Sequence, residues 1–468
     1  MAHPFTDPAP ARARGFGGDA VASPGSDLLE QEQISIGHPA SATMQSQVRD
    51  PILWLFGIDW AGLAAERFAN QYEIRNAGFD LFSFPSNAAL LWFDIDRFVE
   101  RQVARGGRGL RAVLSHEEQF GALCAALIAE RLGLPGTSPD AILRLQHKLL
   151  CRELIEQVAP EANVGFSLLE CELGHLPDQP MSFPAFVKPI KASFSVLARK
   201  VESLAELRDH VRFGPFERLI IERLVKPFDD VCRRRLSCPV DARHMIVEES
   251  VSAEQFNLDG YVFDGQAHCI GVVDEIMYPG TQAFLRFAYP SRLPQAVQER
   301  AFDVAVRVLK AAGFDHGFFN MEFFYDRASD RLSVVEFNPR LAAQLADLYE
   351  RVDGLDVHGM SVAMALGRDP SSVARLPSRA GAAASCALRT FDGSMPAPVG
   401  RKRLRTARER FADTIILTFD KSDSGRRREF KWMGSNRYAV LNLHGRDEAD
   451  LQRHYETVCA SLGWPAPF

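Results

Sequence analysis

Apolar runs alternate with amphipathic stretches through the first third of the chain. The continuous apolar run Ile52–Gly57 predicts a buried strand that leads into a loop. Three amphipathic stretches predict helices: Ala61–Gln71, Phe98–Ala104 and Glu117–Leu132. This alternation favours a small open α/β domain that ends near Pro139. Ser138 and Pro139 then begin a further helix, which we expect to run unbroken through His147 to about Val158.

The middle and end of the chain are richer in strands. Apolar and β-branched runs predict strands at Val164–Leu169, Phe183–Lys188 and Met245–Glu249. Asp264-Gly265 is a strong turn dipeptide, so Phe256–Phe263 and Ala267–Asp274 are expected to form a hairpin. Helical periodicity predicts four later helices: Gln295–Ala312, Leu341–Arg351, His358–Leu366 and Glu448–Leu462. The composition of Pro370–Ser378 marks a boundary before a strand-rich C-terminal unit.

Two apolar strands, Asn320–Tyr325 and Leu332–Asn338, flank a short polar turn and each carry one glutamate. With the turn centred near Ser329, Glu322 and Glu336 lie opposite each other on one face, together with Asn320, Asn338 and Arg340. Like charges so placed repel by roughly 4 kcal/mol at about 4 Å and an effective dielectric near 20. Such a pair needs a proton or a cation, and Mg²⁺ suits these oxygens. The alternative is a pair of strand-edge glutamates that face solvent.

Lys188 ends an otherwise apolar strand. Burial of an ammonium group is costly unless an anion pairs with it, so this lysine is a candidate anion ligand. Pro189 keeps the backbone extended up to the lysine. Lys148, on the preceding helical segment, is a second candidate for the same site, although an ordinary surface lysine explains it equally well.

Composition bounds the class of protein. With 468 residues, 46% of them hydrophobic, the chain divides into two to four domains. The net charge of −6 argues against a nucleic-acid-binding protein, and short basic clusters such as Arg401–Arg405 are read as solvated segments. The eight cysteines include no Cys-x-x-Cys pair and the histidines show no metal-ligand spacing, so we expect free thiols in a reducing cytosol without a zinc site.

Residues 1–48 are rich in Ala, Pro, Gly and Ser, so they are expected to be disordered. No signal-type apolar stretch follows the start, and no run of about 18 apolar residues occurs. We therefore expect a cytoplasmic protein without a membrane or nucleic-acid partner.

Several of these residues occur together in the order of a known family. Lys148, Val187-Lys188-Pro189, Ile246–Glu249, Glu322 and the run Glu336-Phe337-Asn338-Pro339-Arg340 resemble the motifs of the ATP-grasp superfamily. The resemblance spans about residues 50–468 and is closest to the carboxylate–amine ligase branch that includes the L-amino acid ligases. It implies an α/β and α+β ATP-grasp fold in five parts: the disordered segment 1–48, an N-terminal open α/β domain (49–139), a central lobe (140–240), a lobe with the metal site (241–378) and a C-terminal α+β subdomain (379–468).

The resemblance also implies a reaction. ATP activates a carboxylate as an acyl phosphate, an amine displaces phosphate, and ADP is released; a homodimer is one candidate assembly. Arg340 and Lys188 are implied as catalytic residues, and Glu322, Glu336 and Asn338 as ligands of Mg²⁺, with Mn²⁺ as the alternative ion. The implied nucleotide-binding residues are Lys148, Lys188, Ser193, Ser195, Glu248, Glu249, Val251, Glu254, Gln255 and Arg286.

The sequence departs from the family at two places. The segment Ile190–Arg199, where the family has a glycine-rich lid over the phosphates, contains no glycine, and Ser193 and Ser195 are its remaining small donors. Alanines replace glycines after Arg340. These departures keep two other functions open: a nucleotide-binding ATP-grasp protein without turnover, and a carboxylase-like enzyme that activates bicarbonate.

Overall fold

The computed structural model describes residues 49–81, 86–106, 109–169, 176, 182–192, 197–238, 240–396, 398–419, 421 and 423–468. The N-terminal segment 1–48, expected to be disordered, lies outside them, as do Ser193 and Ser195. Residues 49–468 form one unit, which the following paragraphs describe. Among the described helices, none combines the length and the apolar character needed to cross a membrane.

The N-terminal part is a three-stranded parallel sheet with the order β2-β1-β3. Its strands are β1 (Pro51–Leu55), β2 (Glu73–Ala77) and β3 (Ala112–Leu114). The helices that follow are α1 (Asp59–Phe68), α2 (Ile95–Gly106) and α3 (Gly121–Leu132), with a 3₁₀ helix at Ser86–Trp92. Ile52, Trp54 and Leu55 are fully buried. The central strand of a parallel sheet is covered on both faces, and this explains why the residues of β1 do not alternate between apolar and polar.

The prediction of one unbroken helix from Pro139 to Val158 is wrong. Two helices, α4 (Pro139–Gln146) and α5 (Lys148–Val158), meet at His147, whose backbone is extended (φ −83°, ψ 97°). The His147 ring accepts a hydrogen bond from the backbone N–H of Leu150 and so caps α5. A side chain that bonds the nearby backbone competes with continuous helix, and burial of this ring fixes the break.

A four-stranded antiparallel sheet follows, with the order β4-β7-β5-β6. Its strands are β4 (Phe166–Leu169), β5 (Ala185–Pro189), β6 (Arg199–Val201) and β7 (Met245–Glu249). A 3₁₀ helix at Pro160–Ala162, α6 (Leu204–His210) and the 22-residue α7 (Pro215–Leu236) complete this region. The register sets Lys188 opposite Ile246, so the lysine ends a strand in the middle of the sheet.

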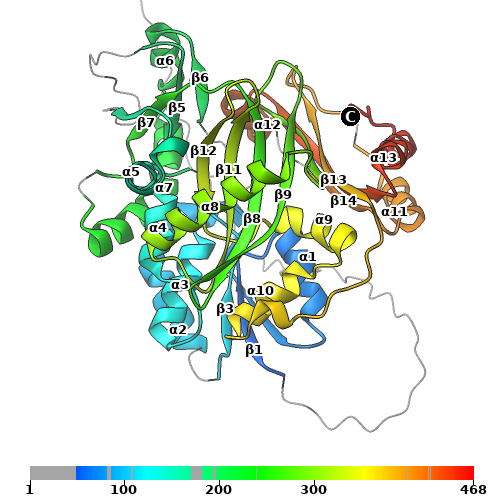
Figure 1. Ribbon diagram of the computed structural model, residues 1–468, viewed down its shortest axis with the longest axis horizontal. Helices are drawn as coiled ribbons and strands as arrows, with labels where there is room; N and C mark the ends of the chain where they lie inside the picture. The colour runs from blue at the N-terminus through cyan, green and yellow to red at the C-terminus, as the bar shows by residue number, and fades with distance from the viewer. Residues whose placement is uncertain are drawn as a thin grey trace, which may run out of the picture. The chain divides into compact units, whose positions relative to one another are not determined.

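The largest sheet has eight strands in the order β12-β11-β8-β9-β10-β13-β15-β14 (Figure 1). Its strands are β8 (Glu254–Phe263), β9 (Gln266–Met277), β10 (Phe284–Tyr289), β11 (Gly317–Asp326), β12 (Arg331–Asn338), β13 (Ala382–Thr390), β14 (Ile415–Thr418) and β15 (Asn436–Gly445). The helices of this region are α8 (Gln295–Ala312), α9 (Ala343–Asp353), α10 (Val357–Ala365), α11 (Arg401–Arg410), α12 (Asp423–Met433) and α13 (Glu448–Leu462), with a 3₁₀ helix at Pro370–Ser372.

Several predicted elements agree closely with the structure. Helices α8 and α13 have the predicted bounds, and α8 packs on β8 and β9 (Figure 1). Asp264 and Gly265 both have positive φ (49° and 73°), as a tight turn that matches the twist of β8 and β9 requires. The paired strands β11 and β12 form the predicted glutamate hairpin.

Candidate functional site

The two glutamates of the hairpin face each other. Glu322 on β11 is paired with Glu336 on β12, and Asn320 with Asn338, as the sequence predicted. Burial, followed by the charge of Glu336, raises the pKa of Glu322 to about 8. Burial alone would also raise the pKa of Glu336, but Lys148 and Lys188 outweigh it and hold that pKa below its ordinary value. The pair therefore shares one firmly held negative charge at neutral pH.

Asn338 leaves an acceptor directed to no described residue. Its amide nitrogen donates to Glu322 Oε1 at 3.2 Å and to Asn320 Oδ1 at 3.1 Å. The Asn338 Oδ1 atom is buried and has no hydrogen-bond partner among the described residues. An unpaired buried oxygen beside two carboxyl groups is a donor set that suits a hard cation, so the residues present fit a Mg²⁺ ion.

Two lysines, Lys148 half-buried and Lys188 buried, approach this cluster from the central region. The first, Lys148, begins α5; its Nζ atom lies 2.9 Å from Glu336 Oε2 and donates to the carbonyl of Ala192 at 3.0 Å. The Nζ atom of Lys188 lies 2.9 Å from Glu248 Oε2 and donates to the Val335 carbonyl at 3.0 Å. Burial lowers the pKa of Lys188. Burial also acts to lower the pKa of Lys148, but the carboxylates of Glu336, Glu118 and Glu322 together outweigh it and raise that pKa. Both predicted lysines are thus next to β12.

The N-terminal part contributes a residue that the sequence did not reveal. Glu118, in the loop between β3 and α3, accepts a hydrogen bond at 2.7 Å from Arg340 Nη2. Its backbone carbonyl accepts hydrogen bonds from Lys191 Nζ at 3.2 Å and from the Gln146 side chain at 2.8 Å. Burial lowers the pKa of Lys191 to about 8. The sequence signal that could have identified Glu118 is its position as an acidic residue shortly after the buried parallel strand β3.

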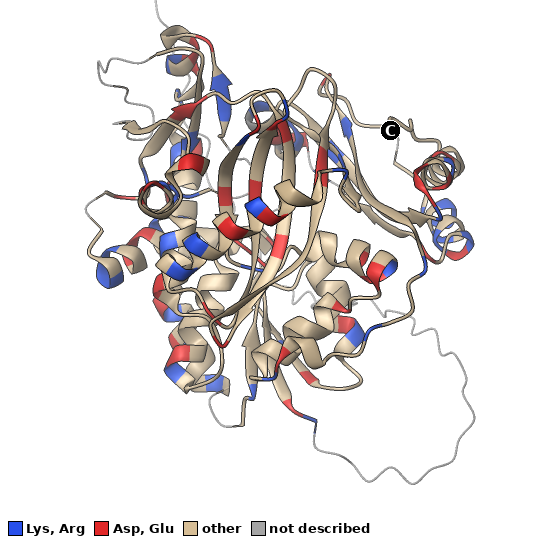
Figure 2. Ribbon diagram, viewed as in Figure 1, with Lys and Arg blue, Asp and Glu red and all other residues tan. Residues whose placement is uncertain are grey.

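A row of polar side chains on β8 and β9 extends the acidic cluster, and Figure 2 shows acidic residues in red on several strands of this sheet. Gln255 donates to Glu322 Oε2 at 3.3 Å, and Asn257 hydrogen-bonds both Asn320 and Glu275. Burial and then the charge of Glu322 raise the pKa of Glu275 well above its ordinary value, and Glu275 Oε2 has no partner among the described residues. Polar residues at every second position of a buried strand were the sequence signal for this row.

Glu248, expected among the nucleotide-binding residues, lies in a buried ion-pair network. Arg152 Nε lies 2.6 Å from Glu248 Oε1, and Lys188 holds the other oxygen. The Arg152 guanidinium also donates to the carbonyls of Val334 at 2.7 Å and Val335 at 3.0 Å. This network joins α5, β5 and β7 to β12, so in this arrangement Glu248 holds the two sheets together.

The remaining expected nucleotide-binding residues lie away from the glutamate pair. Glu249 and Glu254 form exposed ion pairs with Arg331 and Arg327, respectively. Val251 is half-buried just after β7. Arg286 stacks on the ring of Phe468 at 3.9 Å and lies 3.5 Å from Glu448, so it faces the C-terminal helix and tail rather than the glutamates.

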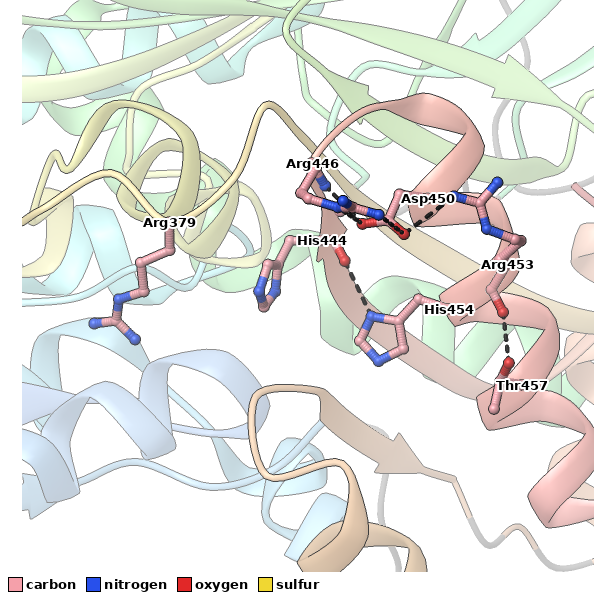
Figure 3. Close-up of a pocket in the computed structure, with 8 residues that line it drawn as sticks. Arg379, His444, Arg446, Asp450, Arg453, His454 and Thr457 are labelled. Carbon is pink, nitrogen blue, oxygen red and sulfur yellow. Dashed lines mark hydrogen bonds and ion pairs between the residues drawn. The ribbon is translucent and has the colours of Figure 1, made fainter.

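Two cavities in the described structure are lined by charged side chains. One of about 10 Å³, room for one water, lies between the lysines and β12. Its lining includes Glu118, Lys148, Arg152, Lys188 and Glu336. A larger cavity of about 390 Å³ lies at β15 and α13, lined by Arg379, His444, Arg446, Asp450, Arg453 and His454, where Asp450 pairs with both Arg446 and Arg453 (Figure 3). Only the small cavity lies among the residues expected to carry chemistry.

Sequence and structure comparisons agree with this geometry. Residues 181–347 match the ATP-grasp domain family. A D-alanine–D-alanine ligase from Synechococcus sp. (strain CC9605) is 27% identical over 171 residues, which cover 36% of this chain and 43% of that protein. Carnosine synthase 1 from Gallus gallus is 28% identical over 295 residues, which cover 58% of this chain and 29% of that protein. The chain thus spans less than half of the length of these relatives.

Solved structures show the same fold. The L-amino acid ligase from Bacillus licheniformis superposes with a TM-score of 0.64 at 12% identity, covering 89% of this chain and 98% of that one. The carboxyaminoimidazole ribonucleotide synthase from Aspergillus clavatus, complexed with ATP, superposes with a TM-score of 0.58 at 12% identity. The superposition covers 89% of this chain and 98% of that one.

The fold is that of ATP-grasp proteins, and the predicted α/β and α+β architecture is confirmed. Residues 181–347 thus match an ATP-grasp domain, and the chain resembles the carboxylate–amine ligase branch, as the motifs indicated.

Proposed function

We propose that this protein is an ATP-dependent ligase that activates a carboxylate as an acyl phosphate and joins it to an amine, with release of ADP and phosphate. One observation carries the proposal. Glu322, Glu336 and the unpaired Asn338 oxygen lie together on one hairpin. Lys148 reaches Glu336 from α5, and Arg340, just after β12, pairs with Glu118 of the N-terminal part. Cations that flank an oxygen cluster suit phosphoryl transfer, which needs positioning and charge rather than a covalent nucleophile.

The lysines are proposed to bind the phosphates of ATP. In the structure Lys148 pairs with Glu336 and Lys188 with Glu248, and the cavity beside them holds about 10 Å³. A nucleotide therefore has to widen this cavity, and its phosphate oxygens would take over part of the lysines' pairing. We propose that the central lobe (140–240) moves relative to the metal-site lobe (241–378) to admit ATP. The other proposed nucleotide contacts are Ser193, Ser195, Glu248, Glu249, Val251, Glu254 and Gln255.

Glu322, Glu336 and Asn338 are the proposed ligands of Mg²⁺. When bound, the ion would neutralise phosphate charge during the transfer. The three side chains project from the paired strands β11 and β12, and this pairing limits the movement of their backbone. The raised pKa of Glu322 is the expected state of a carboxyl group that keeps its proton until a cation replaces it.

Arg340 is the proposed ligand of the reacting carboxylate. Its Nη2 atom donates a hydrogen bond to Glu118. The other guanidinium nitrogens form no hydrogen bond with any described residue, so they are available to a substrate. The γ-phosphoryl group passes to the substrate carboxylate to give an acyl phosphate and ADP. The amine then attacks the acyl carbon, phosphate leaves, and the amine loses a proton. A guanidinium suits the oxyanion that develops in this second step.

The test is phosphate release from ATP and Mg²⁺ with pools of amino acids, other small acids and amines. Release that requires both an acid and an amine, and that is lost in Glu336→Gln but kept in the exposed control Glu202→Gln, supports the ligase. Release that depends on bicarbonate would instead indicate a carboxylase-like enzyme. ATP binding without release under any condition would indicate a nucleotide-binding protein without turnover.

A further inference from the structure

Three soft ligand side chains come together beside the break between α4 and α5. The ligand atoms of His147, Cys232 and Cys238 all lie within 4.8 Å of one another. They come from the cap of α5, the last turns of α7 and the segment just after α7. His147 and Cys232 are 0% and 1% exposed, and Cys238 is half-buried. Residue 147 is far from the two cysteines in sequence, so spacing alone did not predict this cluster.

We propose that His147, Cys232 and Cys238 form a binding site for a thiophilic divalent cation of the Zn²⁺ type. His147 Nε2 lies 3.7 Å from Cys238 Sγ. Two ligands of one tetrahedral zinc, at about 2.1 Å for nitrogen and 2.3 Å for sulfur, are separated by about 3.6 Å. Small side-chain rotations thus suffice to place the three atoms around one ion. Three protein ligands leave a fourth position for water.

The imidazole is prepared for this role. Burial lowers the pKa of His147 to about 4, so the ring is neutral, which is its metal-binding form. Nε2 lies 3.3 Å from the Val240 carbonyl, and Nδ1 lies 3.3 Å from the Leu150 N–H. Both hydrogen bonds are long. Metal binding at Nε2 would replace the bond to the Val240 carbonyl and move the ring proton to Nδ1, at the cost of the bond that Nδ1 accepts from Leu150.

The two thiols alone do not behave as a reactive redox pair. Burial raises the pKa of Cys232 to about 12 and also raises that of Cys238. Buried thiols of this kind react slowly with oxidants, whereas a bound metal stabilises their thiolate forms directly. The proposed site is separate from the glutamate pair, whose oxygen ligands favour Mg²⁺.

The full-length protein, reduced with a phosphine and stripped with a chelator, is titrated with Zn²⁺ against a chromophoric chelator in excess Mg²⁺. A parallel titration with Co²⁺ follows thiolate-to-cobalt charge-transfer absorption. We expect one equivalent of tightly bound Zn²⁺ and a charge-transfer band. Cys238→Ser should weaken Zn²⁺ binding about tenfold or more and reduce the intensity of the band, because one of the two thiolates is lost, while Cys269→Ser, which changes an exposed free cysteine, should leave both intact.

Cys238 is half-buried, so its serine variant is the less disruptive one; Cys232→Ser is the second test, and circular dichroism confirms that each variant is folded. Wild-type protein without a charge-transfer band overturns the proposal. So does a band of unchanged intensity in folded Cys238→Ser protein.

Discussion

Replacement of Glu248 by glutamine tests whether the buried network joins the two sheets. The substitution keeps the shape of the side chain but removes its negative charge. The side chains of Arg152 and Lys188 are 3% and 4% exposed. Among the described residues, Glu248 is the only carboxylate within ion-pair distance of either, and the substitution removes it. They keep the carbonyls of Val334 and Val335, so the fold should survive with reduced stability.

The size of the loss follows from this burial. Removal of one partner of a buried ion pair costs about 3–5 kcal/mol, because it leaves an uncompensated charge. Lys188 has a pKa already lowered by burial and can lose its proton, which limits the cost to the lower part of that range. For a unit of roughly 420 residues the entropy of unfolding is about 0.9 kcal/mol per kelvin, so the expected fall in Tm is about 3–5 °C.

The assay is thermal unfolding of wild-type protein, Glu248→Gln and a matched control at pH 7. The control is Glu202→Gln, because the exposed Glu202 lies 2.8 Å from Lys200 and such a surface pair contributes about 0–1 kcal/mol. The control should change Tm by about 1 °C or less. If Glu248→Gln lowers Tm no more than the control does, the buried network does not stabilise the contact between the sheets.

The same variant predicts a pH dependence with a defined sign. Burial raises the pKa of Glu248, but the charges of Arg152 and Lys188 outweigh burial and lower it overall. A carboxyl group with a lowered folded-state pKa contributes stability above its unfolded pKa and loses it as the pH falls through the folded value. The Tm difference between wild type and Glu248→Gln should therefore be full at neutral pH and shrink below about pH 4. A difference that grows in acid would contradict this reasoning.

Three further predictions concern the acidic cluster. Glu336→Gln should lower phosphate release from ATP at least about 100-fold while circular dichroism stays unchanged, and a wild-type rate would remove Glu336 from the mechanism. Arg340→Ala should reduce ligation about 100- to 1,000-fold but leave ATP affinity within a few fold, as isothermal titration can measure; equal losses in both would contradict an acyl-phosphate role. Burial and Glu322 raise the pKa of Glu275, so Glu275→Gln should match the wild type at acidic pH and become relatively more stable as the pH rises; equal urea midpoints across that range would show that Glu275 ionises normally.

The hairpin could be predicted because its signals are local. The alternation on both strands sets the two glutamates on one face, as predicted. The turn before Arg331 alone would place Glu322 opposite Val335, and a bulge at Val335, which the sequence did not reveal, shifts the register by one residue and brings Glu336 opposite Glu322. Helix α8 could be predicted equally well. Its apolar period indicates a helix, and Pro294 before it and Gly313 after it mark its two ends.

Other features depend on contacts between distant segments. The break at His147 arises from a buried ring whose neighbours come from the end of α7, and no local pattern announces it. Glu118 reaches Arg340 across 222 positions of sequence, and the Arg152 network spans as many as 183. Burial and pairing of this kind depend on the packing of whole elements, which a single sequence does not specify residue by residue.

The loop that carries Glu118 has a consequence for any shortened form of this protein. The family match begins at residue 181, after both Glu118 and Lys148. A fragment limited to 181–347 would keep both glutamates of the hairpin but would leave Arg340 without its carboxylate and Glu336 without its lysine. The smallest piece able to assemble these charges must reach back to the first parallel sheet, so the N-terminal layer is an integral component of the catalytic apparatus proposed for this chain.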